Sequence, residues 1–274
     1  MSKILIVIPA RYDSTRLPGK PLLKIGGIEM IKRVAEIAET VCLTFKMCSY
    51  VVATDDSRIS AFCQSHQIPS VMTPRACQSG SDRVWEAIQV TKRKPSLVIN
   101  LQGDNPLCPP WFISSLIKCW LSNRDEYVVY SAYTSLGWNE LDTLRELKKT
   151  TPSSGTTVQI NRLGYALTFS KSILPLIREE EAYRVTPISP VKRHIGLYAY
   201  TYDALKNFTS WEVGFYERLE RLEQMRFLEN GVPIKMVEVS YRGRSKGIGG
   251  VDNPEDIARV EAIINSPSRY DFGC

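Results

Sequence analysis

The chain alternates short apolar runs, rich in β-branched residues, with segments whose apolar positions recur at helical spacing. The apolar runs lie at residues 4–8, 49–54, 97–102 and 127–133, and the helix-like segments lie at residues 30–39, 57–66, 81–90 and 111–120. Continuous apolar strands that alternate with amphipathic helices predict a parallel sheet covered on both faces. Because ligands of such sheets bind at the carboxyl ends of the strands, the loops that follow residues 8, 54 and 102 are candidate binding loops.

The pattern changes after about residue 142, and the second half predicts more varied elements. These are a hairpin at 156–170 that turns at 162–164, a polar loop at 178–190, strands at 193–201 and 234–239, and a helix at 214–231 that stops at Gly231. A last helix begins at Asn253 as its cap and Pro254 as its first residue. We therefore expect an α/β fold with a mainly parallel central sheet and a mixed or antiparallel second half.

Composition indicates an ordinary globular protein. The 274 residues are 43% hydrophobic and show no repeat or low-complexity linker, so we expect a single domain over residues 1–274. The net charge of +6 is mild, and the basic clusters at 91–95 and 242–247 lack the interleaved aromatics of a nucleic-acid platform.

The same counts argue against several special classes. Seven scattered cysteines without a C-x-x-C spacing, together with two histidines, disfavour a disulfide framework and a zinc site. The apolar run at residues 4–8 is too short for a signal peptide, and no stretch reaches the length of a transmembrane helix. We expect a cytoplasmic protein with no membrane or nucleic-acid partner.

A basic loop follows the first apolar run, in the stretch IPARYDSTRLPGK at residues 8–20. Arg11, Arg16 and Lys20 repel one another on this short loop, and Pro18 and Gly19 shape the approach to the last cation. A solvated basic loop is the alternative interpretation. The position after the first strand of a parallel sheet favours a bound phosphate, although neither the Walker pattern nor the dinucleotide glycine pattern is present.

Two carboxylates stand in similar turns far apart in the chain. Asp104 follows an apolar strand in INLQGDNP, and Asp252 precedes the last helix in GVDNPED. Each aspartate alone is equally typical of a helix cap. Together with a triphosphate, the two carboxylates would form an oxygen-rich site that suits Mg²⁺.

The stretch ACQSGSDRV at residues 76–84 places small polar residues ahead of a helix start. Ser79 or Ser81 is expected to cap that helix. A functional interpretation adds that Gln78, Ser79 and Arg83 face a ligand.

Two later stretches place polar side chains on one face of an element. In KRHIGLYAY, His194 and Tyr198 share one strand face, whereas in LERLEQMR, Glu220, Glu223 and Gln224 share one helix face. A structural histidine and a solvated polar stripe are the alternatives.

Taken together, these stretches resemble the 3-deoxy-D-manno-octulosonate cytidylyltransferases (CMP-Kdo synthetases) over nearly the whole chain. The family patterns are PARYxSTRLPGKPL, VATDD, QSG[TS][DE]R, VNxQGDEP, HIGxYAY, LEQLR and VDTPED. Their counterparts stand here in the same order, at residues 9–22, 52–56, 78–83, 99–106, 194–200, 222–226 and 251–256.

The resemblance implies a Rossmann-like nucleotide-diphospho-sugar transferase fold, with a subregion at about residues 150–200 that serves a homodimer interface and the sugar-acid side. It also implies transfer of CMP from CTP to the anomeric hydroxyl of 3-deoxy-D-manno-octulosonate. The products would be a CMP-sugar and pyrophosphate, Mg²⁺ would be the cofactor, and the CMP-sugar would serve lipopolysaccharide or capsule synthesis.

The family roles can be carried onto the matching positions. The catalytic residues would be Arg11, Lys20, Asp104 and Asp252, of which Asp104 and Asp252 would hold Mg²⁺. The nucleotide would be held by Pro9, Ala10, Arg11, Arg16, Lys20, Gln78, Ser79, Arg83 and Gln102, with the backbone at Pro9 and Ala10 reading the cytosine. The sugar acid would be held by Gln102, His194, Tyr198, Glu223 and Gln224.

The departures from the family patterns lie mainly on the sugar-acid side. Asn105 replaces the glutamate of GDEP, Thr157 stands where the family commonly has lysine, and Lys171 replaces an arginine. Because ammonium and guanidinium groups hold carboxylates differently, a cytidylyltransferase for a nonulosonate or an amino-substituted octulosonate is one alternative. A catalytically silent, nucleotide-binding regulatory protein is the other, against which the intact Asp104 and Asp252 argue.

Overall fold

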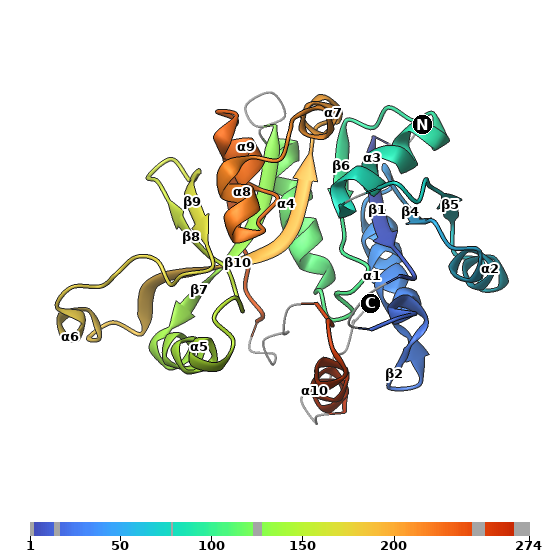
Figure 1. Ribbon diagram of the computed structural model, residues 1–274. Coiled ribbons are helices and arrows are strands. Elements are labelled where there is room, and N and C mark those ends of the chain that lie inside the picture. Colours follow the sequence, from blue (N-terminus) through green and yellow to red (C-terminus); the bar gives the residue numbers. More distant parts are fainter. Residues whose placement is uncertain (1–2, 14–16, 78, 123–127, 243–249, 266–274) are drawn as a thin grey trace. The chain divides into compact units, whose positions relative to one another are not determined.

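The computed structural model describes residues 3–13, 17–77, 79–122, 128–242 and 250–265. The chain divides into two compact units, shown in Figure 1. Unit 1 comprises residues 1–114, 197–209 and 241–274, and unit 2 comprises residues 115–196 and 210–240. Arg16 and Gln78, two of the predicted nucleotide contacts, lie outside the described residues. That the whole chain acts as one catalytic domain stays a prediction.

Unit 1 is built on a mostly parallel sheet. Its strands are β1 (Ile4–Ala10), β4 (Cys48–Thr54), β5 (Ser70–Met72), β6 (Leu97–Asn100) and the last residues of β10 (Ile188–Tyr200). Their order is β10-β6-β1-β4-β5. The strands β6, β1, β4 and β5 are parallel to one another, whereas β10 is antiparallel to β6, with Tyr198 opposite Asn100. The parallel sheet predicted from the first half of the sequence is confirmed.

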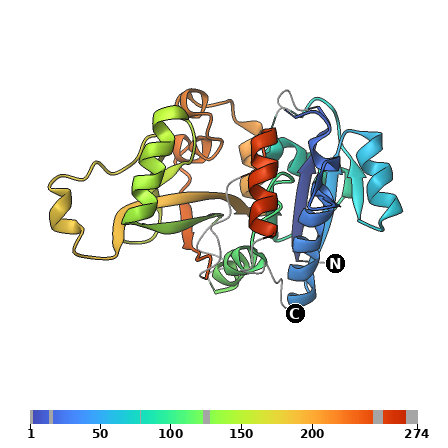
Figure 2. The same ribbon diagram turned by 90° about the horizontal axis from the view of Figure 1, so that it is seen from below.

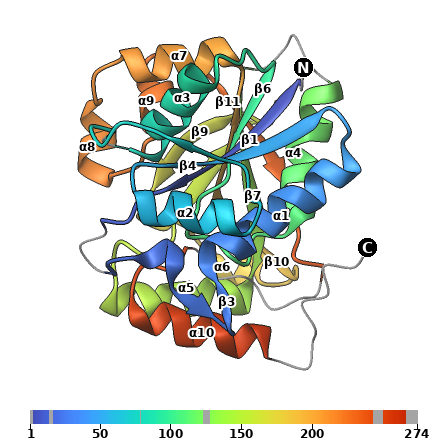
Figure 3. The same cartoon turned by 90° about the vertical axis from the view of Figure 1, so that its right-hand side faces the viewer.

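Helices cover both faces of the central strand of unit 1. Residues Ile4 to Ile8 are at most 1% exposed, and since successive strand residues point to opposite faces, both faces must be covered. The helices are α1 (Met30–Thr44), α2 (Ser57–Ser65), α3 (Gly80–Thr91), α4 (Pro110–Ser122), which passes into unit 2, α7 (Tyr202–Ser210) and α10 (Pro254–Ile264). Helices α1 and α3 pack against β1 and β4 (Figure 3).

A short connection in unit 1 leads from the basic loop to α1. It consists of a 3-10 turn, η1 (Lys20–Leu22), and a small hairpin of β2 (Lys24–Ile25) and β3 (Ile28–Glu29). Ile25 packs in one apolar cluster with Val251 and Val260, so the C-terminal helix α10 is fixed beside this connection.

Unit 2 is the mixed half. Its strands are β7 (Val129–Gly137), β8 (Thr157–Ile160), β9 (Ala166–Ser170), the first residues of β10, and β11 (Ile234–Glu238). β7 and β11 are parallel, whereas β8 is antiparallel to both β9 and β10. Its helices are α5 (Trp138–Thr150), α6 (Glu180–Tyr183), α8 (Phe215–Glu220) and α9 (Met225–Glu229). Helix α5 crosses β7 and β10 in the view of Figure 2, and Leu141 and Leu144 pack against Leu136 and Val191.

Several elements differ from the sequence prediction. Helix α5 was not predicted, because its exposed face is polar and its apolar positions are few. The predicted loop at 178–190 contains α6 and the beginning of β10, so the strand predicted at 193–201 starts earlier, at Ile188.

The single helix predicted at 214–231 is wrong. The chain forms α8 and α9 with a break at Arg221, whose φ is 52°. Arg226 binds Glu217 through two hydrogen bonds of 2.7 and 2.6 Å. A continuous helix would separate these residues by about 13 Å along its axis, so the buried ion pair requires the break.

Candidate functional site

Lys20 joins two distant carboxylates in unit 1. Its Nζ donates to Asp104 Oδ2 at 2.8 Å and to Asp252 Oδ1 at 3.3 Å. The side chain of Lys20 is 14% exposed, whereas those of Asp104 and Asp252 are 31% and 46% exposed. The carboxylates therefore keep oxygen surface open to solvent while one ammonium neutralises part of their charge.

Close backbone approaches bring these segments together. A Cβ on Gly103 would lie 2.4 Å from the carbonyl oxygen of Pro9, so only glycine allows the loop after β6 to pass the end of β1 this closely. A Cβ on Gly250 would lie 2.9 Å from Asp104 Oδ1. The backbone N–H of Val251 donates to the carbonyl oxygen of Asp104 at 2.8 Å and fixes the second approach.

Local backbone features orient Lys20 and Asp252 within the cluster that these two residues form with Asp104. Gly19 adopts a left-handed conformation (φ 69°) directly before Lys20, and its N–H donates to the carbonyl oxygen of Tyr12. At the other end, Asn253 and Asp256 form the capping box of α10, which confirms the predicted helix start. Asp256 Oδ2 also accepts the backbone N–H of Asp252 at 2.8 Å, so the capping residues hold Asp252 in place.

The other predicted nucleotide residues in unit 1 surround the ends of β1 and α3. Ala10 is buried at the end of β1, whereas Arg11 is exposed. Gln102 is half-buried, and a Cβ on Gly80 would lie 3.5 Å from its Oε1. Ser79 forms the capping box of α3 with Asp82, so the predicted cap is confirmed.

Arg83 has protein partners of its own. Its guanidinium is buried, donates to Asp55 Oδ2 at 2.7 Å and donates to Thr73 Oγ1 at 2.8 Å. These contacts tie α3 to the ends of β4 and β5. Direct contact of Arg83 with a nucleotide stays a prediction.

Arg58 is a residue near the basic loop that the sequence did not single out. Its Cζ lies 3.3 Å from the centroid of the Tyr12 ring, and it binds both carboxylate oxygens of Asp56 at 2.9 and 2.7 Å. These hydrogen bonds hold the pKa of Asp56 below its ordinary value. Asp56 and Tyr12 both belong to the family motifs, but nothing in the sequence pattern pointed to the arginine that joins them.

His194 is a buried, neutral side chain of unit 2. Its Nε2 lies 2.8 Å from Ser131 Oγ, and its ring meets the edge of Phe169 at 4.9 Å between centroids. Burial, with a smaller effect from the charge of Lys171, lowers the pKa of His194 to about 3. The imidazole therefore offers neutral hydrogen-bonding groups rather than a charge at physiological pH.

The remaining predicted acid-side residues are distributed over both units. Tyr198, in unit 1, stacks on Tyr200 with 6.1 Å between centroids and 10° between planes. Glu223 and Gln224, in unit 2, lie in the connection between α8 and α9 rather than on the face of one helix, and Gln224 is 3% exposed.

Comparison with known proteins decides the family. The family model for cytidylyltransferases matches residues 5–237. The chain belongs to the cytidylyltransferase family. The 3-deoxy-manno-octulosonate cytidylyltransferase of Maricaulis maris is 40% identical over 261 residues, which cover 95% of this chain and 96% of that protein. The enzyme of the same name from Dichelobacter nodosus is 36% identical over 264 residues, which cover 95% and 97%.

Solved structures agree with the predicted fold class and family. A CMP:2-keto-3-deoxy-manno-octonic acid synthetase complexed with CTP superposes with a TM-score of 0.81 at 34% identity, covering 96% of this chain and 98% of that one. A cytidylyltransferase from Leptospira borgpetersenii superposes with a TM-score of 0.58 at 16% identity and shows the fold alone. The predicted Rossmann-like, mixed α/β fold and the nucleotidyltransferase class are confirmed.

In this cytidylyltransferase, the carboxylate oxygens beside Lys20 suit a divalent cation whose remaining ligands are substrate oxygens. Within the described residues, no group of three or more His, Cys, Asp or Glu side chains gathers around one point. Asp104 and Asp252 supply two carboxylates, and Mg²⁺ in phosphoryl-transfer sites is commonly held by one or two carboxylates plus phosphate oxygens. The residues present therefore fit such a cation.

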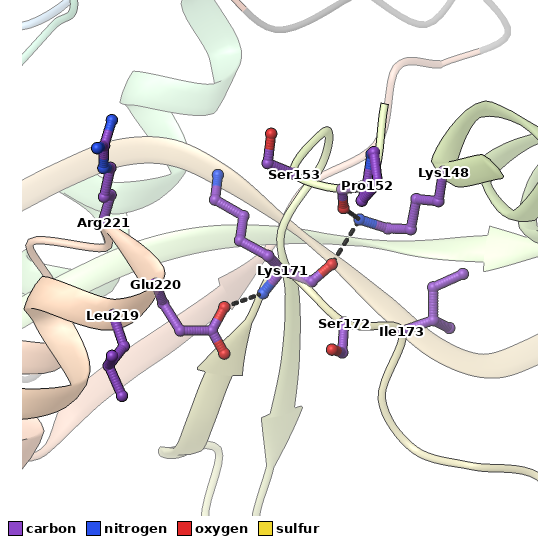
Figure 4. A pocket seen from close by; sticks show the side chains of 9 residues that line it. All are labelled: Lys148, Pro152, Ser153, Lys171, Ser172, Ile173, Leu219, Glu220 and Arg221. Carbon is purple, nitrogen blue, oxygen red and sulfur yellow. Dashed lines mark hydrogen bonds between the residues drawn. The ribbon is translucent and has the colours of Figure 1, made fainter. Parts of the chain in front are cut away.

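The cytidylyltransferase also carries a pocket of about 770 Å³ in unit 2 that sequence reasoning missed (Figure 4). Its lining residues are Lys148, Pro152, Ser153, Lys171, Ser172, Ile173, Leu219, Glu220 and Arg221. Of these, only Lys171 and Glu220 had been singled out. In the part of the chain that the structure describes, no helix is long and apolar enough to cross a membrane.

Proposed function

We propose that this cytidylyltransferase transfers CMP from CTP to the anomeric hydroxyl of 3-deoxy-D-manno-octulosonate and releases pyrophosphate. The observation that carries the proposal is the convergence of Lys20, Asp104 and Asp252 at one point. The names of its relatives, and the CTP complex of the similar synthetase, support the substrates.

On the nucleotide side, we assign charge neutralisation to the basic loop. Lys20 and Arg11 stabilise the negative charge that grows on the departing pyrophosphate, because both follow the end of β1, where ligands of parallel sheets bind. Asp104 and Asp252 are the residues that would hold Mg²⁺, which supplies electrostatic stabilisation of the phosphates when bound. Gly19 and the capping box of α10 orient Lys20 and Asp252, so catalysis here rests mostly on positioning.

On the acid side, we assign hydrogen bonding to His194, Tyr198, Glu223 and Gln224. His194 stays neutral at pH 7, so it orients a hydroxyl through a hydrogen bond without attracting the carboxylate. The attraction for an acid must then come from other side chains. Lys171 is a candidate, because its cationic side chain lines the pocket of unit 2.

A different ulosonic acid is the second candidate substrate, and Thr157 favours it. Thr157 is fully buried, and its hydroxyl donates to the Ser172 carbonyl at 2.7 Å while accepting the N–H of Leu174 at 3.1 Å. Position 157 therefore offers no cation to an acid, whereas CMP-Kdo synthetases commonly have a lysine there.

The test is pyrophosphate release from CTP with three acceptors: 3-deoxy-D-manno-octulosonate, its 8-amino analogue and a nonulosonate. We expect strict use of CTP and the highest kcat/KM with 3-deoxy-D-manno-octulosonate, whereas a higher kcat/KM with either other acid would favour the second candidate. Lys171→Arg and Asn105→Glu then test two of the departures. A preference for plain octulosonate that neither variant changes would make the departures neutral, whereas no turnover with any acid, with CTP still bound, would favour the regulatory protein.

We also propose a cytoplasmic homodimer. Unit 2 exposes several large apolar side chains in and beside the 150–200 subregion, among them Leu163, Leu167, Leu176 and Val185, which are 72%, 61%, 86% and 84% exposed. A homodimer interface that covers these side chains would remove their apolar surface from water. Analytical ultracentrifugation tests the proposal, and a monomer at micromolar concentration would refute it.

A further inference from the structure

The pocket of unit 2 carries more cationic than anionic side chains. Lys148, Lys171 and Arg221 line it beside one carboxylate, Glu220. That carboxylate is already engaged, because Oε1 accepts from Ser170 Oγ and Oε2 accepts from the backbone N–H of Lys171, both at 2.7 Å. In Figure 4 the side chains of Lys171 and Arg221 extend in the same direction. The pocket therefore suits a small anion.

Lys148 does not itself reach out to such an anion. Its ammonium, near the end of α5, donates to the carbonyl oxygens of Lys171 at 2.5 Å, Gly155 at 3.0 Å and Pro152 at 3.2 Å, and also to that of Ser154. An ammonium has three N–H donors, so these carbonyls account for all of them. Any effect of Lys148 on a ligand must pass through the backbone that it holds.

The carbonyls that Lys148 gathers belong to two segments of the pocket wall. One is the turn at residues 152–155 after α5, and the other is Lys171, just past the end of β9. Without a cation at their centre, the carbonyl dipoles would point at one another and the segments would separate. Burial, followed by the charges of Lys171 and Arg193, lowers the pKa of Lys148.

We propose that Lys148 is a positioning residue for the acid-binding side of the enzyme, because it fixes the 152–155 turn and the backbone of Lys171 around the pocket. The proposal rests on the proposed function, since it takes the anion to be the sugar-acid substrate. Strand β8 connects the pocket wall with a candidate acid-side residue, because the backbone N–H of His194 donates to the carbonyl oxygen of Thr156 at 2.9 Å and the neighbouring Thr157 hydroxyl donates to the carbonyl oxygen of the pocket residue Ser172 at 2.7 Å.

The experiment compares Lys148→Met, Lys148→Arg and Lys149→Met in the full chain. Lys149 is the matched control, because it neighbours Lys148 but is 69% exposed and pairs with Glu146 on the surface. For each variant, pyrophosphate release gives kcat, KM for CTP and KM for 3-deoxy-D-manno-octulosonate, and thermal unfolding reports folding.

We expect Lys148→Met to raise KM for the acid by about tenfold or more and to leave KM for CTP within about twofold, a split that a general loss of fold does not give. Lys148→Arg keeps the charge, but its planar fork cannot converge on the same carbonyls, so it should not restore the wild-type KM. If Lys148→Met fails to fold, Lys148→Arg alone decides.

Two results would overturn the inference while wild-type turnover stands. One is an unchanged KM for the acid in Lys148→Met, and the other is full wild-type behaviour of Lys148→Arg, which would make charge alone sufficient. Absence of turnover in the wild type with octulosonate would instead count against the proposed function.

Discussion

Replacing Lys20 by methionine should tighten the binding of a divalent cation to the protein in the absence of nucleotide. The ammonium of Lys20 lies 2.8 Å from Asp104 and 3.3 Å from Asp252, and the same carboxylate oxygens are the ones that would hold Mg²⁺. The ammonium and the metal ion therefore compete for one pair of carboxylates. Methionine keeps most of the length of the side chain and removes the competing charge.

The size of the effect follows from burial. Exposed ion pairs contribute about 0.2–1 kcal/mol, whereas two charges about 4 Å apart at an effective dielectric of about 20 attract by about 4 kcal/mol. Lys20 is largely buried, but its partners are 31% and 46% exposed, so the lower range applies. With about 1 kcal/mol for each pair, removal of both should strengthen metal binding by about 2 kcal/mol, or about 30-fold.

The assay is a titration with Mn²⁺ as the probe, at low ionic strength and without CTP, in which the free ion is followed by electron paramagnetic resonance. Lys24→Met is the matched control, because Lys24 is 67% exposed and lies 3.8 Å from Glu29, away from the two aspartates. Asp104→Asn should abolish tight binding in either background. Equal or weaker Mn²⁺ binding by Lys20→Met than by the wild type would refute the competition.

The same variant should impair catalysis although it binds the metal ion more tightly. If Lys20 neutralises the leaving pyrophosphate, its loss should lower kcat more than it raises KM for CTP, because the charge that it meets grows in the transition state. An increase confined to KM for CTP would reduce Lys20 to a passive phosphate contact.

Three further predictions concern buried polar groups. Arg226→Met should lower the free energy of unfolding in urea by about 3–5 kcal/mol, because it leaves the buried carboxylate of Glu217 without its ion-pair partner. An additional Glu217→Leu change should recover most of the loss, and a loss below about 1 kcal/mol in Arg226→Met would contradict this. Burial lowers the pKa of His194 to about 3 in the folded state, so below about pH 6.5 only the unfolded state binds a proton at this imidazole. The free energy of unfolding should therefore fall by about 2 kcal/mol from pH 7 to pH 5, and His194→Gln should remove that loss. Asn100 is fully buried, and its side-chain oxygen and nitrogen have no hydrogen-bond partner among the described residues. Asn100→Leu should therefore raise the free energy of unfolding by about 1–3 kcal/mol, as measured by thermal unfolding. A lower melting temperature would argue for a buried water at this amide.

The parts of the fold that sequence patterns predicted correctly are governed by local physics. The apolar run at β1 is buried on both faces, and Asn253 with Asp256 forms the cap that begins α10. The turn of the β8–β9 hairpin also lies where it was predicted, with Gly164 in a left-handed conformation (φ 82°). In each case, the residues that determine the element are within a few positions of one another.

The parts that failed depend on contacts between distant residues. The break between α8 and α9 is held by Arg226 and Glu217, and a helical pattern in the sequence cannot show that these two side chains pair. Lys148 lies on a polar helix that no apolar pattern marked, and its role appears only when the carbonyls of the 152–155 turn and Lys171 converge on it.

The Lys20 cluster of unit 1 and the pocket of unit 2 therefore differ in how their residues are held. Around Lys20, the left-handed Gly19 and the cap of α10 beside Asp252 are local features, whereas the close approach of Gly103 to Pro9 joins residues that are distant in sequence. Around the pocket of unit 2, the wall depends on an ammonium from another element. A single change at this pocket wall can therefore shift several backbone groups together. Changes of acid preference among related enzymes should accordingly include the residues of this wall, with the CTP preference retained.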